Sequence, residues 1–253
     1  MAYKIQRYGW IHDLPDHRDQ LYSAPVTALQ TLPPKVDLTP QCPPVYDQGQ
    51  LGSCTANSIG AAVEFEQMKQ KMTDGFAPSR LFIYFNERAM EGTVDFDSGA
   101  QIRDGIKSVA QQGVCPETEW PYNIAKFKIK PPKKCYVDAF KHRVVLYQRV
   151  TQTLNQFRGC LASGYPFVLG FTVYESFESP AVAKSGHAPM PAPAEKSIGG
   201  HAVMAVGYDD TKQWFLLRNS WGQGWGRKGY FTLPYAYVTD AQLASDFWTI
   251  RLV

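Results

Sequence analysis

The sequence lacks both a long apolar run and a strong net charge. No stretch is long and apolar enough to cross a bilayer as a helix, so we expect no membrane span. The 253 residues carry 26 basic and 23 acidic side chains, a formal net charge of +3 at pH 7. So balanced a charge does not indicate a nucleic-acid partner, because such proteins concentrate cationic side chains.

The first eight residues lack the apolar core of a secretory signal peptide. If Met1 is the native start, this predicts a cytosolic protein or one that leaves the cell by an unconventional route. If a signal peptide was trimmed and Met1 added, the protein is secreted or lumenal. The sequence leaves both compartments open.

Cysteine is scarce. Besides Cys54 there are four, Cys42, Cys115, Cys135 and Cys160, an even number that allows three pairings. Cys115 and Cys135 flank a proline-rich crossing and are the first candidates for a bridge. The alternative, that all four are reduced small hydrophobes, stays equally open.

Apolar and aromatic residues, by contrast, are plentiful, at 44% and 13% of the chain. A chain of this size and composition buries a substantial core, in one large domain or in two halves around a cleft. Lysines alternate with apolar residues over 126–130 and continue at Lys133 and Lys134, a pattern typical of an exposed strand edge with a solvated face.

Helical periodicity comes early in the chain and strand patterns come late. Apolar spacing predicts helices starting near Cys54, over 81–89, over 102–110 with a stop at Gly113, and over 154–161. Runs of β-forming residues predict strands over 167–174, 201–208, 214–218 and 229–233. Helices and strands that are segregated in this way indicate the α+β class.

Cys54 stands six residues after Gln48, at an expected helix start. In the first turn of a helix, unpaired N–H groups and the helix dipole stabilise a thiolate, which is what a reactive cysteine needs. A side-chain amide nearby could donate to an oxyanion. A buried structural cysteine is the commoner alternative.

Two later segments supply a base and a group to orient it. His201 lies near the start of the apolar strand over 201–208, and Asn219 follows a short hairpin. A histidine in an apolar strand is more often a core residue, and an asparagine before a serine is more often part of a turn. The order Cys, His, Asn along one chain is what favours the catalytic interpretation.

At these residues the chain resembles the papain family of cysteine peptidases, from about residue 36 to the C-terminus. The matching blocks are Gln48, Gly52-Ser53-Cys54, Asp97-Ser98-Gly99, Trp120-Pro121-Tyr122, His201-Ala202-Val203, Asn219-Ser220-Trp221-Gly222 and Gly224-Trp225-Gly226. In papain-type enzymes the histidine and asparagine follow the catalytic cysteine by roughly 130–150 residues. The spacing from Cys54 to His201 falls within this range, and the spacing to Asn219 is a little longer. The resemblance implies a two-lobed papain-like α+β fold. A helical left half (about 47–140) and an antiparallel β-barrel-like right half (about 141–253) would enclose an active-site cleft.

The resemblance also implies the roles of individual residues. Cys54, His201 and Asn219 would form a catalytic triad, with Gln48 in the oxyanion hole. Four residues would bind substrate: Ser98, Gly99, Gly200 and Trp221. The implied protein is a monomeric cysteine endopeptidase acting on peptides or proteins, with neither a metal nor a cofactor.

Three positions depart from the family pattern. Leu51 replaces a cysteine that is commonly disulfide-bonded, Thr55 replaces an aromatic residue, and Gly200 replaces an acidic or amide residue. None removes a triad member, and together they indicate a divergent, microbial-type member.

Two other function classes stay open beside the peptidase. An amide-group transferase such as a transglutaminase uses a similar Cys-His pair, but with an acidic orienting group where this chain has Asn219. A non-enzymatic binding protein on a peptidase scaffold is expected to have lost a catalytic residue, whereas all are present here.

Two segments remain without a fixed role. Residues 1–34 form an N-terminal extension in which Tyr8, Trp10 and Ile11 stand beside acidic residues, a composition that should dock on a surface. It would either cover the active-site groove as a short pro-segment or pack as a strap on the back of the molecule. The long segment 175–199 is interpreted as a surface insertion in preference to a mobile rim of the cleft.

Overall fold

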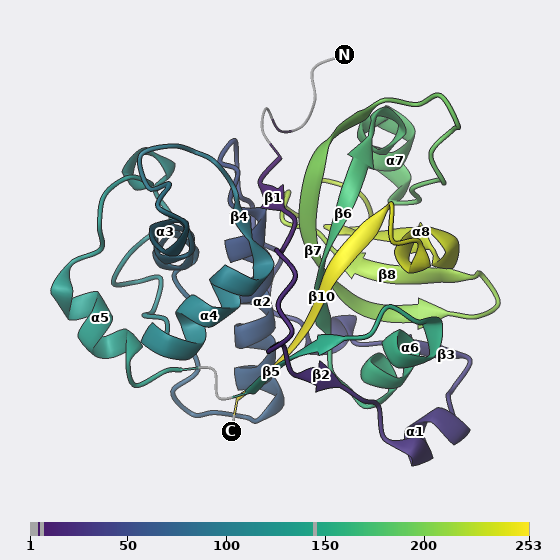
Figure 1. Cartoon of the computed structure of the whole chain (residues 1–253), viewed down its shortest axis with the longest axis horizontal. Coiled ribbons are helices and arrows are strands. Elements are labelled where there is room, and N and C mark those ends of the chain that lie inside the picture. Colours follow the sequence, from purple (N-terminus) through teal and green to yellow (C-terminus); the bar gives the residue numbers. More distant parts are fainter. Residues whose placement is uncertain (1–4, 6–7, 144–145, 253) are drawn as a thin grey trace.

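The segregation of helix and strand patterns along the chain produces two lobes, a helical one and a twisted sheet (Figure 1). The computed structural model describes all residues except 1–4, 6–7, 144–145 and 253. The predicted α+β class is confirmed. Among the described helices, none combines the length and apolar character needed to cross a membrane.

The helical lobe is built from α2 (Cys54–Lys69), α3 (Arg80–Glu91), α4 (Ile102–Gln112) and α5 (Lys133–Ala139), with the short 3-10 turn η2 (Ile124–Lys126). Ser79 caps α3 by accepting the Phe82 N–H, and Gly113 ends α4 with φ of 79°, a conformation that favours glycine. The lysine-rich segment 126–134 is not the strand edge that its alternation predicts. It forms a 3-10 turn, a loop and the start of α5, because prolines at 131 and 132 prevent a strand there.

The second lobe is an eight-stranded sheet in the order β2-β5-β10-β6-β7-β8-β9, with β3 paired to β7. Its long strands are β5 (Leu146–Val150), β6 (Phe167–Tyr174), β7 (Ser197–Asp209), β8 (Trp214–Arg218), β9 (Tyr230–Pro234) and β10 (Ala244–Arg251). All pairs among them are antiparallel. Three helices accompany the sheet, α6 (Leu154–Ala162), α7 (Pro180–Ser185) and α8 (Tyr235–Thr239), along with the 3-10 turns η1 (Thr39–Gln41) and η3 (Glu175–Glu178).

The N-terminal residues join both lobes. We call residues 8–22 the strap; it contains β1 (Trp10–Ile11) and β2 (Leu21–Tyr22). β1 pairs in parallel with β4 (Ala100–Gln101) of the helical lobe, and β2 pairs in parallel with β5 of the sheet. α1 (Val26–Gln30) and β3 (Lys35–Asp37) follow, and in Figure 1 the purple strap descends along the boundary between the lobes.

One further sequence expectation is corrected, and one open alternative is decided. Segment 175–199 is not a mere surface insertion, because Phe177 in η3 is buried and its ring lies 5.6 Å from that of Trp221. The five cysteines are free thiols, so the reduced alternative holds and the candidate bridge is not formed. The Cys115 and Cys135 thiols are nevertheless in hydrogen-bonding contact.

Candidate active site

Cys54 is the first residue of α2, as its sequence context predicts, and its side chain is fully buried. Ser53 occupies the N-cap position, and its carbonyl accepts the Asn57 N–H at 3.0 Å. The sulfur therefore lies at the amino end of a sixteen-residue helix that faces the sheet.

His201 lies on β7, and Asn219 immediately follows the neighbouring strand β8. His201 Nε2 lies 2.8 Å from Asn219 Oδ1, which also accepts the Ser220 N–H at 2.8 Å. Since Asn219 Oδ1 is an acceptor, Nε2 carries the proton. His201 Nδ1 is buried and has no hydrogen-bond partner within the described part of the chain, which leaves it available as a base. The Trp221 ring lies over the imidazole, with centroids 4.9 Å apart.

A hydrogen bond between the lobes fixes the cysteine helix against the histidine strand. Ser58, one turn after Cys54, donates its hydroxyl to the Ala202 carbonyl at 2.9 Å. The Ala202 N–H in turn points to the Cys54 sulfur. The residue after His201 thus contacts both the Cys54 sulfur and the helix that carries it, which places the start of α2 against β7 next to His201.

Gln48 is held beside this pair by three hydrogen bonds. Its N–H donates to the Ser220 carbonyl at 2.8 Å, and the Ser220 hydroxyl donates to Gln48 Oε1 at 2.6 Å. The side-chain Nε2 donates one hydrogen to the Leu51 carbonyl at 2.8 Å. The orientation of the amide is therefore set, and its second N–H remains for another acceptor.

The remaining predicted substrate-binding residues lie differently. Gly99 has φ of 75° and approaches the strap backbone, and Gly200 lies against Trp10. The Ser98 hydroxyl instead donates within its own loop, to Thr93 Oγ1 and the Gly99 carbonyl, both at 2.9 Å. The structure therefore brings Gly99 and Gly200 to the site and turns the Ser98 hydroxyl away from it.

The strap fills the site. A Cβ placed on Gly9 would lie 1.7 Å from the Gly52 carbonyl oxygen, and one on Gly99 would lie 2.2 Å from the Gly9 oxygen. The Ala100 N–H donates to that same Gly9 oxygen at 2.8 Å. The Gly9 backbone is thus clamped between the loop before Cys54 and the loop before α4, at a spacing that only glycine permits.

The strap also covers the histidine and excludes water. The Tyr8 ring lies 6.1 Å from the His201 ring, and its hydroxyl donates to Glu178 of η3 at 2.5 Å. Burial raises the pKa of the Cys54 thiol to about 12, although the Ala202 and Gly9 N–H groups oppose the shift. Burial likewise lowers the pKa of His201 to about 4 against the hydrogen bond to Asn219. In this covered state the pair is neutral, in contrast to the thiolate expected from the helix start alone.

The sequence predicts no role for two acidic residues that organise the site, although Asp97 lies in one of the matching blocks. Asp97 accepts the Gly52 N–H at 3.1 Å and the Tyr84 hydroxyl, which fixes the loop before Cys54. Asp246 on β10 accepts the Trp10 indole N–H at 3.1 Å. The signal for Asp97 was its matching block, and the signal for Asp246 was an acidic residue inside an apolar run near the C-terminus.

Comparisons with known proteins agree with this arrangement. A family model described as papain family cysteine protease matches residues 32–247. The chain is 44% identical over 272 residues to an uncharacterized peptidase C1-like protein, L477, of Acanthamoeba polyphaga mimivirus, which covers 98% of this chain and 88% of that protein. It is 30% identical over 207 residues to chymopapain of Carica papaya, covering 75% of this chain and 51% of chymopapain.

Solved structures resemble the whole chain. Xylellain, a cysteine protease from Xylella fastidiosa, superposes with a TM-score of 0.93 and 46% identity, covering 100% of this chain and 98% of xylellain. Bromelain from Ananas comosus superposes with a TM-score of 0.68 and 20% identity, covering 87% of this chain and 100% of bromelain. At that identity the bromelain match shows the common fold alone.

Proposed function

Because this chain belongs to the papain family of cysteine peptidases, we propose that Cys54, His201 and Asn219 form its catalytic triad and that it cleaves extended polypeptides as an endopeptidase. The observation that carries this proposal is the 2.8 Å contact of His201 Nε2 with Asn219 Oδ1. It leaves the unprotonated Nδ1 free of Asn219, and the residue after His201 contacts the Cys54 sulfur through its N–H, which supports a pairing of Nδ1 with Cys54. That is the arrangement a thiol nucleophile requires of its base.

The proposed reaction has two halves. The Cys54 thiol gives its proton to His201 Nδ1, and the sulfur attacks the peptide carbonyl carbon. The Cys54 N–H and the free N–H of the Gln48 amide stabilise the resulting oxyanion. The C–N bond then breaks as His201 returns the proton to the leaving amine, and water, deprotonated by His201, hydrolyses the thioester.

The triad assignment is tested by substitution and by labelling. Cys54→Ala and His201→Ala should each abolish peptide hydrolysis, and Asn219→Ala should reduce it less, because Asn219 orients and does not react. A peptidyl epoxide should modify Cys54 and spare Cys42, as read by mass spectrometry. Near-normal turnover in a folded Cys54→Ala or His201→Ala variant would remove the assignment.

We further propose that the strap restrains the enzyme, as a short pro-segment does. Gly9 lies in the backbone clamp that an extended substrate would need, and Tyr8 covers His201. Occupation of the clamp excludes substrate sterically. Burial of the thiol and the imidazole also disfavours the ion pair on which nucleophilic attack depends.

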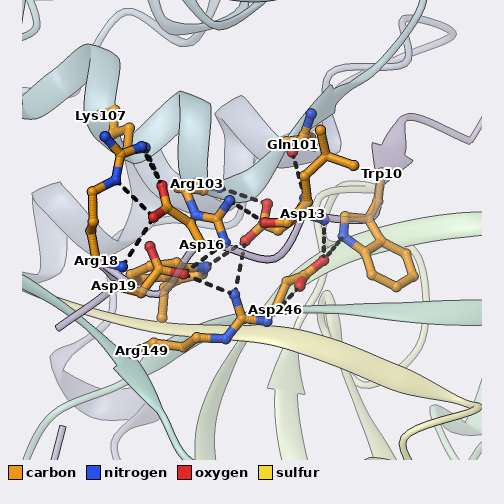
Figure 2. Close-up of polar contacts among 12 residues, drawn as sticks. Trp10, Asp13, Asp16, Arg18, Asp19, Gln101, Arg103, Lys107, Arg149 and Asp246 are labelled. Carbon is orange, nitrogen blue, oxygen red and sulfur yellow. Dashed lines mark hydrogen bonds and ion pairs between the residues drawn. The ribbon is translucent and has the colours of Figure 1, made fainter. Parts of the chain in front are cut away.

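A network of charges holds the strap in place (Figure 2). Three strap carboxylates face cations of both lobes, and the pairs are Asp13–Arg149, Asp16–Lys107, Asp19–Arg103 and Asp19–Arg149. The Asp13 side chain is fully buried and also accepts the Arg103 N–H at 3.0 Å and the Trp248 indole N–H at 2.8 Å. So extensive a set of contacts supports a docked strap over a loosely attached one.

The proposed restraint is tested by adding one methyl group to the strap at position 9. In Gly9→Ala the new Cβ would collide with the Gly52 carbonyl, so the strap should leave the clamp and the peptidyl epoxide should modify Cys54 faster. Gly224→Ala is the matched control, because a Cβ there meets nothing within 4 Å. Equal labelling rates in Gly9→Ala and the parent chain would contradict the restraint but not the triad.

A further inference from the structure

The Trp10 indole occupies a pocket beside the proposed catalytic pair. Its two walls are glycines, Gly170 on β6 and Gly200, which immediately precedes His201. A Cβ on Gly170 would lie 1.9 Å from Trp10 Cε2, and one on Gly200 would lie 2.6 Å from Cε3. The indole is only 6% exposed. The missing side chains therefore create a space shaped for a large flat group.

The floor of this pocket is a carboxylate, Asp246 (Figure 2). Asp246 is 2% exposed and accepts the Trp10 indole N–H on Oδ2 at 3.1 Å. It lies in β10 where the register with β6 shifts between Ser245 and Trp248, and its φ is 58°. A bulge with a left-handed residue redirects a side chain that a regular strand would point elsewhere, and such bulges are common beside active sites.

We propose that this pocket receives a substrate side chain once Trp10 has left it, and that Asp246 selects tryptophan there over other large side chains. The inference rests on the proposed peptidase function and names its substrate class. The strap acts in this respect as an internal ligand, because it presents to the pocket the group that the pocket is built to bind.

The contacts of Asp246 explain why the pocket should prefer a neutral hydrogen-bond donor over a cation. Arg149 contacts Asp246 Oδ1 at 3.0 Å, so the carboxylate already has its counter-ion. Among the residues that the structure describes, Oδ2 receives only strap donors, the Trp10 indole N–H and the Asp13 N–H at 2.9 Å, and both depart together. The vacated pocket then contains one acceptor oxygen without a protein donor. An indole N–H satisfies it, phenylalanine leaves it unpaired, and an arginine side chain would be repelled by Arg149.

The test uses the full chain carrying Gly9→Ala and Trp10→Ala, because the new Cβ at position 9 displaces the strap from the clamp and the second change removes the indole. A fluorogenic peptide library varies each residue on both sides of the cleaved bond. At one position, kcat/KM for tryptophan should exceed that for phenylalanine by about tenfold or more, since a hydrogen bond to a charged acceptor is lost. Phenylalanine or leucine equal to tryptophan at every position, or a preference for arginine, would overturn the proposal.

Two variants in the chain carrying Gly9→Ala and Trp10→Ala locate the preference. Asp246→Ala should bring the tryptophan-to-phenylalanine ratio close to one, and the isosteric Asp246→Asn, which is less disruptive to folding, should reduce it by several fold. Asp16→Asn removes a strap carboxylate that contacts Lys107 outside the pocket and should leave the ratio unchanged. The ratio compares two substrates on one sample, so it does not depend on the fraction of folded protein.

The outcomes separate this inference from the proposed function. Hydrolysis without a tryptophan preference, or a preference that survives Asp246→Ala, would overturn the pocket assignment and leave the peptidase intact. A chain carrying Gly9→Ala and Trp10→Ala that is folded but neither cleaves any peptide nor reacts with the peptidyl epoxide would overturn both.

Discussion

Each member of the Cys54–His201 pair is buried so that its charged form is disfavoured. The thiol pKa is raised to about 12 and the imidazole pKa is lowered to about 4, both chiefly by burial. When the strap leaves, water and substrate dipoles return, and the helix amino end and the Asn219 acceptor act on a solvated pair. We therefore expect the strap to control protonation as well as access.

Gln48 is expected to act mainly in the transition state. In the Gly9→Ala chain, Gln48→Ala should lower kcat by about 10²–10³ with a smaller change in KM, because an oxyanion donor contributes where negative charge develops. Steady-state kinetics with a fluorogenic peptide measure this. Gln50→Ala, an exposed amide two residues away, serves as the control. An unchanged kcat would exclude Gln48 from the oxyanion site.

Asp13 makes strap docking dependent on pH. Burial, followed by the Asp246 charge, raises its pKa from 3.8 to about 6, although the Arg103 N–H and guanidinium and the Trp248 N–H oppose the shift. Arg149 also faces Asp13, and Glu91 on α3, whose own pKa burial raises to about 7, lies close enough for its charge to interact with that of Asp13. A carboxyl that binds its proton more tightly when docked favours docking at low pH. This stabilisation is complete below about pH 4 and is lost as the pH rises through about 6.

The rate at which the peptidyl epoxide labels Cys54 tests whether docking of the strap weakens as the pH rises. The ratio of rates in Gly9→Ala and the parent chain should be larger at pH 5 than at pH 7.5, and the ratio removes most of the thiol's own titration. Asp13→Asn should flatten the dependence, whereas Asp16→Asn should retain it, because Arg18 holds the pKa of Asp16 low, below this window. A ratio that rises with pH would contradict the role given to Asp13.

Helix α2 and strand β7 are joined by one side-chain hydrogen bond, from Ser58 to the Ala202 carbonyl. Ser58→Ala should lower stability by about 1 kcal/mol, or Tm by about 2–4 °C for a chain of this size. Ser108→Ala is the matched control, because it also removes one hydrogen bond of a buried serine hydroxyl, here to the Gly105 carbonyl within α4. Both should lower Tm, and only Ser58→Ala should also slow Cys54 labelling in the Gly9→Ala chain. Equal labelling in the two would show that the bond does not align the site.

Elements with strong local signals were predictable from the sequence. The helix after Ser79 and the strand Phe167–Tyr174 follow from capping and β-forming residues, and Gly113 ends α4 as expected. β10 was missed, because its ends are polar and its pairing with β5 and β6 is long-range. The alternating lysines suggested a strand where Pro131 and Pro132 prevent one.

The site was predictable in its motifs but not in its surroundings. Gln48, Cys54, His201 and Asn219 stand in recognisable local contexts. The position of Asp246 depends on a bulge, and that of Trp10 depends on two distant glycines. Neither can be read from neighbouring residues, because both arise from tertiary contacts.

The strap ties the two lobes into one unit. Asp19 contacts Arg103 of α4 at 2.7 Å and Arg149 of β5 at 3.3 Å, and it is nearly buried. Asp19→Asn leaves two cations without their shared partner. It should lower the free energy of unfolding by about 3 kcal/mol, as loss of a buried ion partner does, and should speed Cys54 labelling.

Thermal unfolding and epoxide labelling of one sample test both effects. Asp138→Asn is the control, because its partner Lys141 is largely exposed, and it should change Tm by less than about 1 °C. A Tm for Asp19→Asn as high as that of the control would mean that the strap contributes little to the cohesion of the lobes.

The strap remains covalently continuous with β3, which is an integral strand of the sheet. Re-docking after any excursion is therefore intramolecular, with an effective concentration that dilution cannot change. A cut in the exposed stretch around Arg18, whose side chain is 76% exposed, would abolish that advantage. The cleaved peptide bearing Gly9 and Trp10 could then diffuse away. Uncovering of the site, which is reversible in the intact chain, would then be irreversible.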